Sequence, residues 1–282
     1  MSTCPPSDAN QGVTRLAAVH LYPATMNTYG DRGNVAALSR RAQWRQLDLR
    51  WHPVELGQPA PEHPDLVFMG GGQDRVQHAI AEDLVQRREW LRTCAAGGTV
   101  IFAVCAGFQL LGRSYTAADG SRLEGVGLLA IDTAAAQPGE WRLIGNTVVE
   151  VHTPHGPRIL AGFENHGGRT YLHSVPPLGM VRTGHGNNGR DGTEGACQGT
   201  VIATYLHGPV LPKNAWLTDH LLHLALQHAG ADPALLTPLD DSFETAAQEE
   251  AVARANTAER TARALPRRLS ARACAPLRRA RR

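Results

Sequence analysis

The stretch TVIFAVCAGFQLLG, residues 99–112, decides the fold expected of this chain. A β-branched, apolar run ends at Cys105, small residues follow, and an apolar helical pattern begins directly behind them. This order predicts a buried strand, a sharp turn and a helix N-terminus, which together form a nucleophile elbow. The spacing Ala103-x-Cys105-x-Gly107 puts small residues where the strand and helix backbones crowd together. The positive end of the helix would favour a thiolate at this point.

A cysteine after a strand is more often a small core residue, so the elbow needs support from other segments. The triplet Gly70–Gly72 directly follows an apolar run at 66–69, and the run 201–206 ends at His207. Because the carboxyl ends of parallel strands meet at one edge of a sheet, we expect both segments beside Cys105. They would supply backbone donors for an oxyanion and a histidine that acts as base and then as acid.

The pattern along the chain predicts an α/β fold with a mostly parallel sheet covered by helices on both faces. Strands are expected at 16–22, 47–55, 66–69, 99–104, 125–132, 144–152, 158–165 and 201–206, and helices at 35–46, 75–92, 214–228 and 243–264. The middle strands, joined by short polar turns, suggest a partly antiparallel section.

One domain is expected over residues 15–236, followed by a C-terminal helix over 237–265. Residues 1–14 and 266–282 are expected to be disordered. The chain has a net charge of +2, but residues 251–282 hold ten arginines against one glutamate, which leaves a mildly acidic body. The basic tail is either a solvated segment or a contact to an anionic membrane, and no nucleic-acid partner is expected.

The five cysteines form no C-x-x-C pair, and no H-E-x-x-H motif occurs, so we expect no metal site and a reducing compartment. The glycine triplet is not followed by the G-K-[ST] of a phosphate loop, which argues against nucleotide binding. The sequence also has no apolar stretch long enough to span a membrane and no secretory signal at its N-terminus.

With these segments in place, the chain resembles the class I, triad-type glutamine amidotransferases of flavodoxin-like fold. Within them it is most similar to the GatD-type subunits of lipid II isoglutaminyl synthase, which work with MurT. The matching stretches are 26–34, 70–74, 104–112, 162–171, 184–195 and 204–214. The last three are specific to the GatD type, whereas the elbow alone also fits domains of the cobyric acid synthase type.

The resemblance implies roles for five residues. Cys105 would attack the side-chain amide carbon of L-glutamine and form a thioester, and His207 would relay the protons. The backbone amide of Ala106, with that of Gly71 or Gly72, would donate to the oxyanion.

The resemblance also implies two substrate contacts. Gln109, one helical turn after the nucleophile, would touch the glutamine, and Arg142 would grip its carboxylate through a bidentate fork. Without the resemblance, Arg142 would be interpreted as an ordinary surface arginine. The segments at 163–171, with Glu164, and at 184–195 are rich in Gly and Asn, which suggests shaped loops. They would line the substrate pocket or the partner interface, and the sequence leaves both open.

One position departs from the general class. Many of these enzymes carry an acid two residues after the histidine, but Pro209 stands there. We therefore expect the partner subunit to supply the third member of the triad.

The resemblance implies a cytoplasmic glutaminase subunit, at the inner face of the membrane if the tail binds there. It would pass ammonia to a MurT-like ligase that uses ATP and Mg²⁺ and converts the D-glutamate of lipid II to D-isoglutamine. No cofactor is expected in this chain. The alternatives are a glutaminase for another amidation, as in cobyric acid synthase, and a non-catalytic binding subunit with the same fold.

Overall fold

The computed structural model describes residues 13–27, 30–72 and 77–264. Its centre is a six-stranded sheet in the order β13-β14-β4-β3-β1-β2, in which β13 is antiparallel and the other strands are parallel. These strands are β1 (Arg15–Leu21), β2 (Asp48–Val54), β3 (Leu66–Met69), β4 (Val100–Val104), β13 (Ala196–Gln198) and β14 (Val201–Thr204). Every residue of β3, β4 and β14 is buried, as their unbroken apolar runs predict for central parallel strands.

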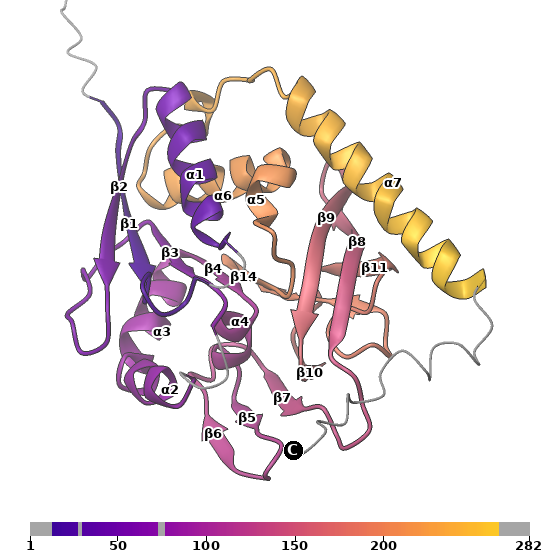
Figure 1. Cartoon of the computed structure of the whole chain (residues 1–282). Coiled ribbons are helices and arrows are strands. Elements are labelled where there is room, and N and C mark those ends of the chain that lie inside the picture. The colour runs from indigo at the N-terminus through magenta and orange to yellow at the C-terminus, as the bar shows by residue number, and fades with distance from the viewer. Residues whose placement is uncertain (1–12, 28–29, 73–76, 265–282) are drawn as a thin grey trace, which may run out of the picture.

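Helices cover both faces of this sheet (Figure 1). One face carries α1 (Arg32–Trp44) and α6 (Ala215–His228), which also contact each other, and the other carries α2 (Gln77–Gln86) and α3 (Arg88–Gly97). Two short helices, α4 (Ala106–Leu110) and α5 (Val210–Lys213), follow β4 and β14 at the carboxyl edge of the sheet. The predicted α/β architecture is confirmed.

Two smaller sheets lie beside the central one. The first has the order β10-β7-β5-β6 and the second β12-β11-β8-β9. Their strands are β5 (Ser114–Thr116), β6 (Arg122–Glu124), β7 (Ile131–Ala135), β8 (Leu143–Thr153), β9 (Gly156–His166), β10 (Gly168–Leu172), β11 (Gly179–Thr183) and β12 (Thr193–Glu194). All pairings in them are antiparallel except that of β5 with β7, which confirms the expected antiparallel section.

Two predicted elements are wrong in detail. The strand expected at 125–132 is mostly a loop, because Val126 and Leu128 donate their backbone N–H groups to the end of the α4 segment instead of pairing with a strand. The helix expected at 75–92 is divided at Arg87 into α2 and α3, and residues 75–76 lie outside the described residues. The second of these helices runs on to Gly98, whose left-handed φ of 90° ends it.

The predicted C-terminal helix is α7 (Ser242–Ala264), which runs across β8, β9 and β11 (Figure 1). Polar contacts anchor it: Gln248 donates to the Ile159 carbonyl and to the side chain of Asn214, and Thr183 donates to Asn256. A single 3₁₀ turn, η3 (Pro233–Leu235), precedes it. The faces of α7 that do not contact these strands are largely exposed, as expected of a sequence rich in Ala, Glu and Arg.

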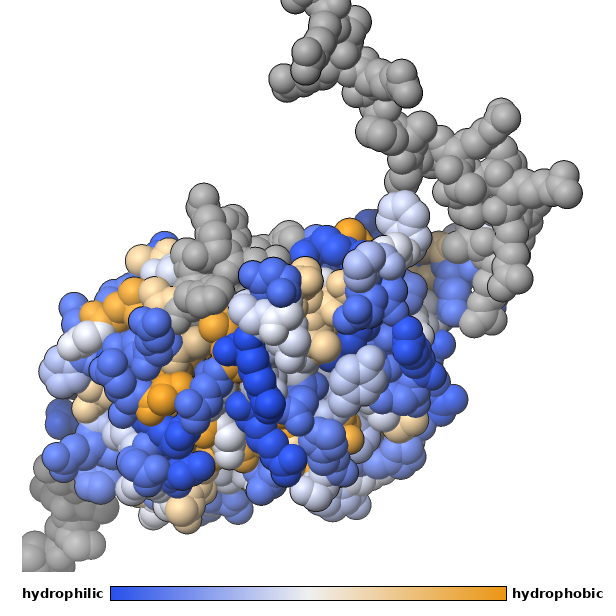
Figure 2. All heavy atoms as spheres, turned by 90° about the horizontal axis from the view of Figure 1, so that it is seen from below, coloured by the Kyte–Doolittle hydropathy of each residue, from blue (hydrophilic) through white to orange (hydrophobic). Residues whose placement is uncertain are grey.

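The predicted disordered ends, 1–14 and 266–282, fall almost entirely outside the described residues. No helix of the described part is long and apolar enough to cross a membrane. Hydrophilic side chains dominate the face seen in Figure 2, and hydrophobic ones are scattered among them.

Candidate active site

The elbow predicted at Cys105 is present between β4 and α4. Cys105 adopts φ 52° and ψ −105°, a conformation that non-glycine residues rarely take and that turns the side chain out of the strand direction. Its backbone N–H donates to the Thr204 carbonyl of β14 at 2.8 Å. A Cβ on Gly107 would lie 2.9 Å from the Met69 carbonyl oxygen, so only glycine fits this close helix–strand approach. The Cys105 residue is 8% exposed, so it lies at the edge of the hydrophobic core.

His207 comes directly after β14 and is held at both its backbone and its ring. Its backbone exchanges two hydrogen bonds with Phe163 of β9, of 2.7 and 3.1 Å. The imidazole is fully buried, its Nδ1 hydrogen-bonds to Asp31, and the ring interacts electrostatically with Cys105. Burial alone would lower the pKa of His207, but the negative charge of Cys105 and the hydrogen bond to Asp31 outweigh it and raise that pKa. The surroundings of His207 therefore favour its protonated, imidazolium form.

A carboxylate of this chain stands where the sequence predicted a gap. Asp31 immediately precedes α1, is fully buried, and places its Oδ1 3.3 Å from His207 Nδ1. The expectation that a partner subunit supplies the acid is thus corrected. Pro209, which stands at the usual acid position, packs against Gly33 in the first turn of α1. A Cβ on Gly33 would overlap the proline ring. The start of α1 brings Asp31 to the imidazole instead.

The glycine triplet meets the site as expected, but one of its predicted roles changes. The Gly71 backbone N–H donates to Asp31 Oδ2 at 2.6 Å, so this amide is engaged by a carboxylate rather than offered to a substrate oxyanion. A Cβ on Gly71 would lie 2.6 Å from His207 Cε1 and 3.3 Å from Cys105 Cβ, which shows how tightly it is enclosed. A Cβ on Gly72 would lie 3.7 Å from Ala106 Cβ, in ordinary contact.

Gly72 and Ala106 remain the predicted pair of oxyanion donors. Ala106 starts α4, whose first backbone N–H groups have no acceptor within the helix. Gln73 and Asp74 of the same loop lie outside the described residues.

Gln109 points into a buried polar network rather than to the surface. It is 4% exposed, and its Nε2 donates to Tyr205 Oη at 3.1 Å. Tyr205 Oη also shares a hydrogen bond with Thr170, and its ring stacks on His166 with centroids 3.6 Å apart. The predicted contact of Gln109 with substrate stays a prediction, and the structure adds a role for it in fixing the elbow helix to Tyr205, which directly follows β14.

Arg142 lies on the surface beside the end of β9. Its Nε donates to Asn165 Oδ1 at 3.0 Å, and its Nη2 to the Asn165 carbonyl at 3.1 Å. A Cβ on the neighbouring Gly167 would lie 3.3 Å from Arg142 Nη1, and one on Gly168 would overlap Gln109 Nε2. Arg142 and Gln109 thus lie against two consecutive glycines, while the role of Arg142 as a carboxylate clamp stays a prediction.

The two segments that the sequence left undecided hold buried acids that support the site, and the first, expected to be a loop, is instead the end of β9 and most of β10. Glu164 accepts the backbone N–H groups of His185 and Gly186, at 2.7 and 2.8 Å. Glu194 accepts the Tyr205 N–H at 2.7 Å and the Thr204 hydroxyl at 3.0 and 3.1 Å. Neither acid has any exposed surface.

Glu194 therefore braces the last residues of β14, which bind the Cys105 amide and lead into His207. Burial, with Glu164 adding its charge, raises the pKa of Glu194 to about 7. We call Glu194, Thr204 and Tyr205 the β14 brace. Sequence reasoning missed it, although the acids of the Gly-rich segment shortly before the His207 strand are a signal that could have suggested it.

Among the described residues, no three His, Cys, Asp or Glu side chains are grouped so that they could hold a metal ion. Taken together, an elbow cysteine, a strand-end histidine and a buried carboxylate at the carboxyl edge of an α/β sheet define the site of a glutamine amidotransferase.

Comparisons with known proteins agree with this class. Residues 17–215 match the model of the CobB/CobQ-like glutamine amidotransferase domain. Subunit GatD of the glutamine-hydrolyzing lipid II isoglutaminyl synthase from Staphylococcus aureus (strain N315) is 37% identical over 244 residues, which cover 86% of this chain and 96% of that protein. Its Streptococcus pneumoniae counterpart (strain ATCC BAA-255 / R6) is 37% identical over 84% of this chain and 90% of that protein.

The chain therefore belongs to the CobB/CobQ-like glutamine amidotransferases, in the family of the GatD subunits. The fold agrees with the solved structure of PurLQS from Thermotoga maritima, which matches with a TM-score of 0.52 and 18% identity over 77% of this chain and 98% of that one.

Proposed function

We propose that this chain is the glutaminase subunit of a lipid II isoglutaminyl synthase. Two observations together support the proposal. Cys105, His207 and Asp31 form a complete triad arrangement, and the chain is 37% identical to a GatD subunit along 96% of that protein. The chain would hydrolyse L-glutamine and deliver the ammonia to a partner that amidates lipid II.

The reaction would begin with Cys105 as a thiolate and His207 as an imidazolium. Cys105 Sγ attacks the side-chain amide carbon of glutamine, and the negative charge that develops on the carbonyl oxygen is stabilised by the amides of Ala106 and Gly72. When the tetrahedral intermediate collapses, the C–N bond breaks and His207 gives its proton to the leaving nitrogen, which departs as ammonia.

His207 then takes a proton from water, which attacks the thioester and releases glutamate. The C–S bond breaks in this step, so Cys105 leaves as a thiolate beside the protonated His207, which is the starting pair. The new carboxyl group of glutamate loses its proton to solvent, and the cycle balances. Asp31 contacts His207 Nδ1 throughout, which fixes the ring orientation and leaves the other nitrogen for Cys105. Asp31 acts as a positioning residue because it touches the base and not the substrate.

Arg142 would hold the glutamine carboxylate, since a guanidinium fork can donate two parallel hydrogen bonds to it. Two of its nitrogens already bond to Asn165, which fixes the direction of the fork. Replacing Arg142 by Gln should raise KM for glutamine about tenfold to a hundredfold with little change in kcat, because the lost contact is made before and during the reaction.

The proposed partner is a MurT-like ligase that binds ATP and Mg²⁺ and activates the D-glutamate carboxylate of lipid II for conversion to D-isoglutamine. The complex would work in the cytoplasm, where the basic residues after 265 could touch the anionic inner face of the membrane. A chain that ends at Leu265 should then bind anionic vesicles more weakly, and equal binding would refute the membrane contact.

The central test is ammonia release from glutamine by the chain with its co-expressed ligase partner, using lipid II as acceptor. Cys105→Ala should reduce release to background, and Cys94→Ala, which removes a buried thiol away from the site, should leave it near normal. Ammonia release that survives Cys105→Ala would refute the mechanism.

The second candidate is a glutaminase for a corrinoid amidation, because the matching family model is shared with CobB/CobQ-like domains. The same assay with a corrinoid carboxylate in place of lipid II separates the two. Amide formed on the corrinoid and none on lipid II would overturn the proposal and leave the glutaminase mechanism intact.

A further inference from the structure

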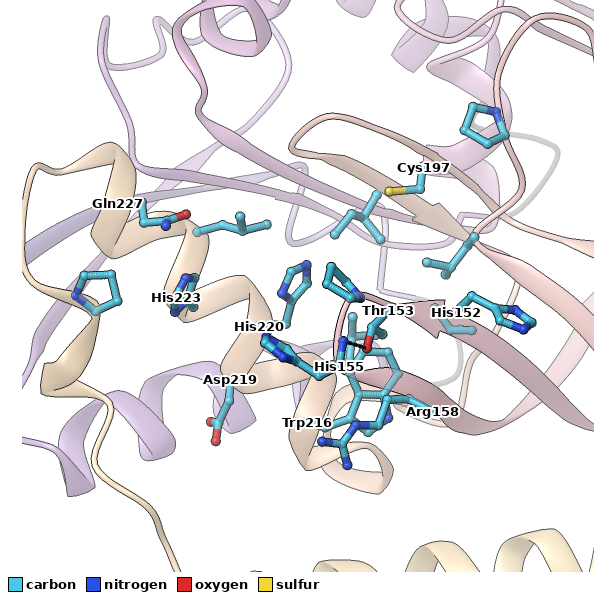
Figure 3. Close-up of a pocket in the computed structure, with 18 of the residues that line it drawn as sticks. His152, Thr153, His155, Arg158, Cys197, Trp216, Asp219, His220, His223 and Gln227 are labelled. Carbon is cyan, nitrogen blue, oxygen red and sulfur yellow. Dashed lines mark hydrogen bonds between the residues drawn. The ribbon is translucent and has the colours of Figure 1, made fainter.

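A pocket of about 760 Å³ lies between the tip of the β8–β9 hairpin, α6 and the η3 turn (Figure 3). It shares none of its lining residues with the candidate active site. His207 pairs with Phe163 of β9, and Arg158 of the pocket lies five residues earlier on the same strand, so the two sites are roughly 17 Å apart along β9. The pocket is therefore a separate feature of the molecule.

The inner wall of the pocket is apolar. It is formed by side chains of the hairpin, the central sheet and α6, namely Val151, Leu178, Ile202, Leu217 and Leu224, with Trp216 on one side. Most of these residues belong to the hydrophobic core or pack against it. A ligand that entered would bury apolar surface against a preformed wall, which is the commonest construction of small-molecule sites.

The polar lining holds one arginine and several histidines, which can become cationic when protonated. Arg158 and His155 come from the hairpin and its base, and His220 and His223 from α6; Figure 3 shows imidazoles from these two elements close together over the pocket. Among the described residues, the side chains of these four make no hydrogen bond and no ion pair. His155, Arg158 and His220 are exposed and His223 is half-buried, so these nitrogens face water in the free protein and are available to a ligand that replaces that water.

The pocket's own acid cannot compensate them. Asp219 is the carboxylate in the lining, and both of its oxygens are held by Arg41 and Arg45 at 2.6 to 3.1 Å. Figure 3 shows the Asp219 side chain directed away from the histidines. At the rim, His152 is 3.6 Å from Glu150, so that imidazole is the one with an acidic neighbour.

We propose that this pocket binds a small amphipathic anion, with a carboxylate or phosphate headgroup on Arg158 and His220 and an apolar body along the inner wall. Trp216 borders the same space, so binding should change its fluorescence. The proposal stands apart from glutamine hydrolysis and does not depend on which acceptor is amidated.

The proposal predicts a pH dependence with a definite sign. Burial, and to a smaller extent the neighbouring His223, lower the pKa of His220, so it is largely neutral in the free protein at pH 7. A bound anion would favour the protonated ring, which couples binding to proton uptake. The charged or titratable groups around it are Arg158, the other pocket histidines His152, His155 and His223, and Asp219, whose charge is compensated by two arginines. Affinity should therefore rise as pH falls from 8 to 6.

Calorimetric titration of the full chain at pH 6 tests the idea with decanoate, decyl phosphate and decyltrimethylammonium. We expect saturable one-to-one binding of the anions and none of the cation, and the tighter of the two anions identifies the headgroup. Arg158→Gln and His220→Gln should each weaken binding about tenfold. Arg50→Gln and His63→Gln, which remove exposed cations elsewhere, should leave affinity unchanged.

Three results would overturn the proposal: no saturable binding of either anion, equal binding of anionic and cationic probes, or unchanged affinity in both pocket variants. Ammonia release should be normal in Arg158→Gln and His220→Gln, which shows that the variants are folded and keeps this test separate from that of the glutaminase.

Discussion

Asp31 and Glu194 are two fully buried carboxylates that reach the end of β14 from opposite parts of the chain. Asp31 meets an imidazole, and its charge helps to raise the pKa of His207. Glu194 meets a hydroxyl and a backbone N–H, which are neutral, and the pKa of Glu194 itself rises to about 7. Asp31 thus lies beside a ring that can carry the compensating positive charge, whereas Glu194 is surrounded by neutral donors and holds β14 in place.

The largest effect is expected when the Asp31 side is broken. Asp31→Asn removes the charge that holds the imidazolium, so kcat for glutamine should fall about a hundredfold or more, and the pKa of His207 should drop. Ammonia release and an NMR titration of the imidazole measure the two quantities. Asp65→Asn is the matched control, since Asp65 is bonded to His228 away from the site. An unchanged His207 pKa in Asp31→Asn would contradict the assignment.

A smaller but still clear loss is expected at Gly71, which links Asp31 to the glycine loop. In Gly71→Ala the new methyl would lie 2.6 Å from His207 Cε1, so either the ring or the loop must shift. We expect kcat to fall at least tenfold, because small displacements of catalytic groups are costly. Gly72→Ala meets ordinary contacts and should lose only a few-fold. Equal losses in the two variants, compared by steady-state kinetics, would show that Gly71 has no special place.

The Glu194 side should respond in stability rather than in rate. In Glu194→Gln the amide oxygen can still accept the Tyr205 N–H, so kcat should stay within a few-fold of normal.

The pKa of Glu194 is raised in the folded state from 4.5 to about 7, so the wild-type chain binds the extra proton when folded. Its free energy of unfolding therefore loses up to ~3 kcal/mol as pH rises from 4.5 through 7, and Glu194→Gln should lack this loss. Urea unfolding at pH 5 and pH 8 measures the difference. Glu62→Gln, at an exposed position, is the control. A wild-type–variant difference independent of pH would argue against a buried, titrating Glu194.

The smallest effect concerns the coupling between the two acids. Asp31 contacts the His207 ring, whereas Glu194 contacts the backbone and hydroxyl before it, so the two share no partner atom. In a double-mutant cycle of Asp31→Asn and Glu194→Gln, the unfolding free energies should add to within about 0.5 kcal/mol. A larger coupling energy would mean that the β14 brace also sets the position of the imidazole.

The sequence was a good guide where a feature is local. The elbow depends on consecutive residues around Cys105, and the strand before His207 is a short apolar run, so period and residue size predicted both. The same reasoning failed at 125–132, because its apolar residues are buried against the end of the α4 segment and not in a sheet. A hydrophobic pattern shows that residues are buried, but not which partner buries them.

The sequence contained the acid that completes the triad, but it could not show which acid this is. Asp31 stands in a polar, glycine-containing loop after β1, at the correct edge of a parallel sheet, so it was one of several acids that could meet His207. The choice depends on the strand order β4-β3-β1 and on the packing of Gly33 against Pro209. The partner-supplied acid was predicted because spacing along the chain was taken as the guide, while the actual contact joins residues 176 positions apart.

By itself, the sequence determined the class of fold and predicted which cysteine and histidine meet at the sheet edge, because a strand, a turn and a helix start are set by neighbouring residues. The tertiary structure alone decided which acid holds His207, that the Gly71 amide is used by Asp31, and that Glu194 braces β14. The physical reason is that hydrogen bonds and buried charges act over about 3 Å, and only the packed sheet brings residues so distant in the chain within that range.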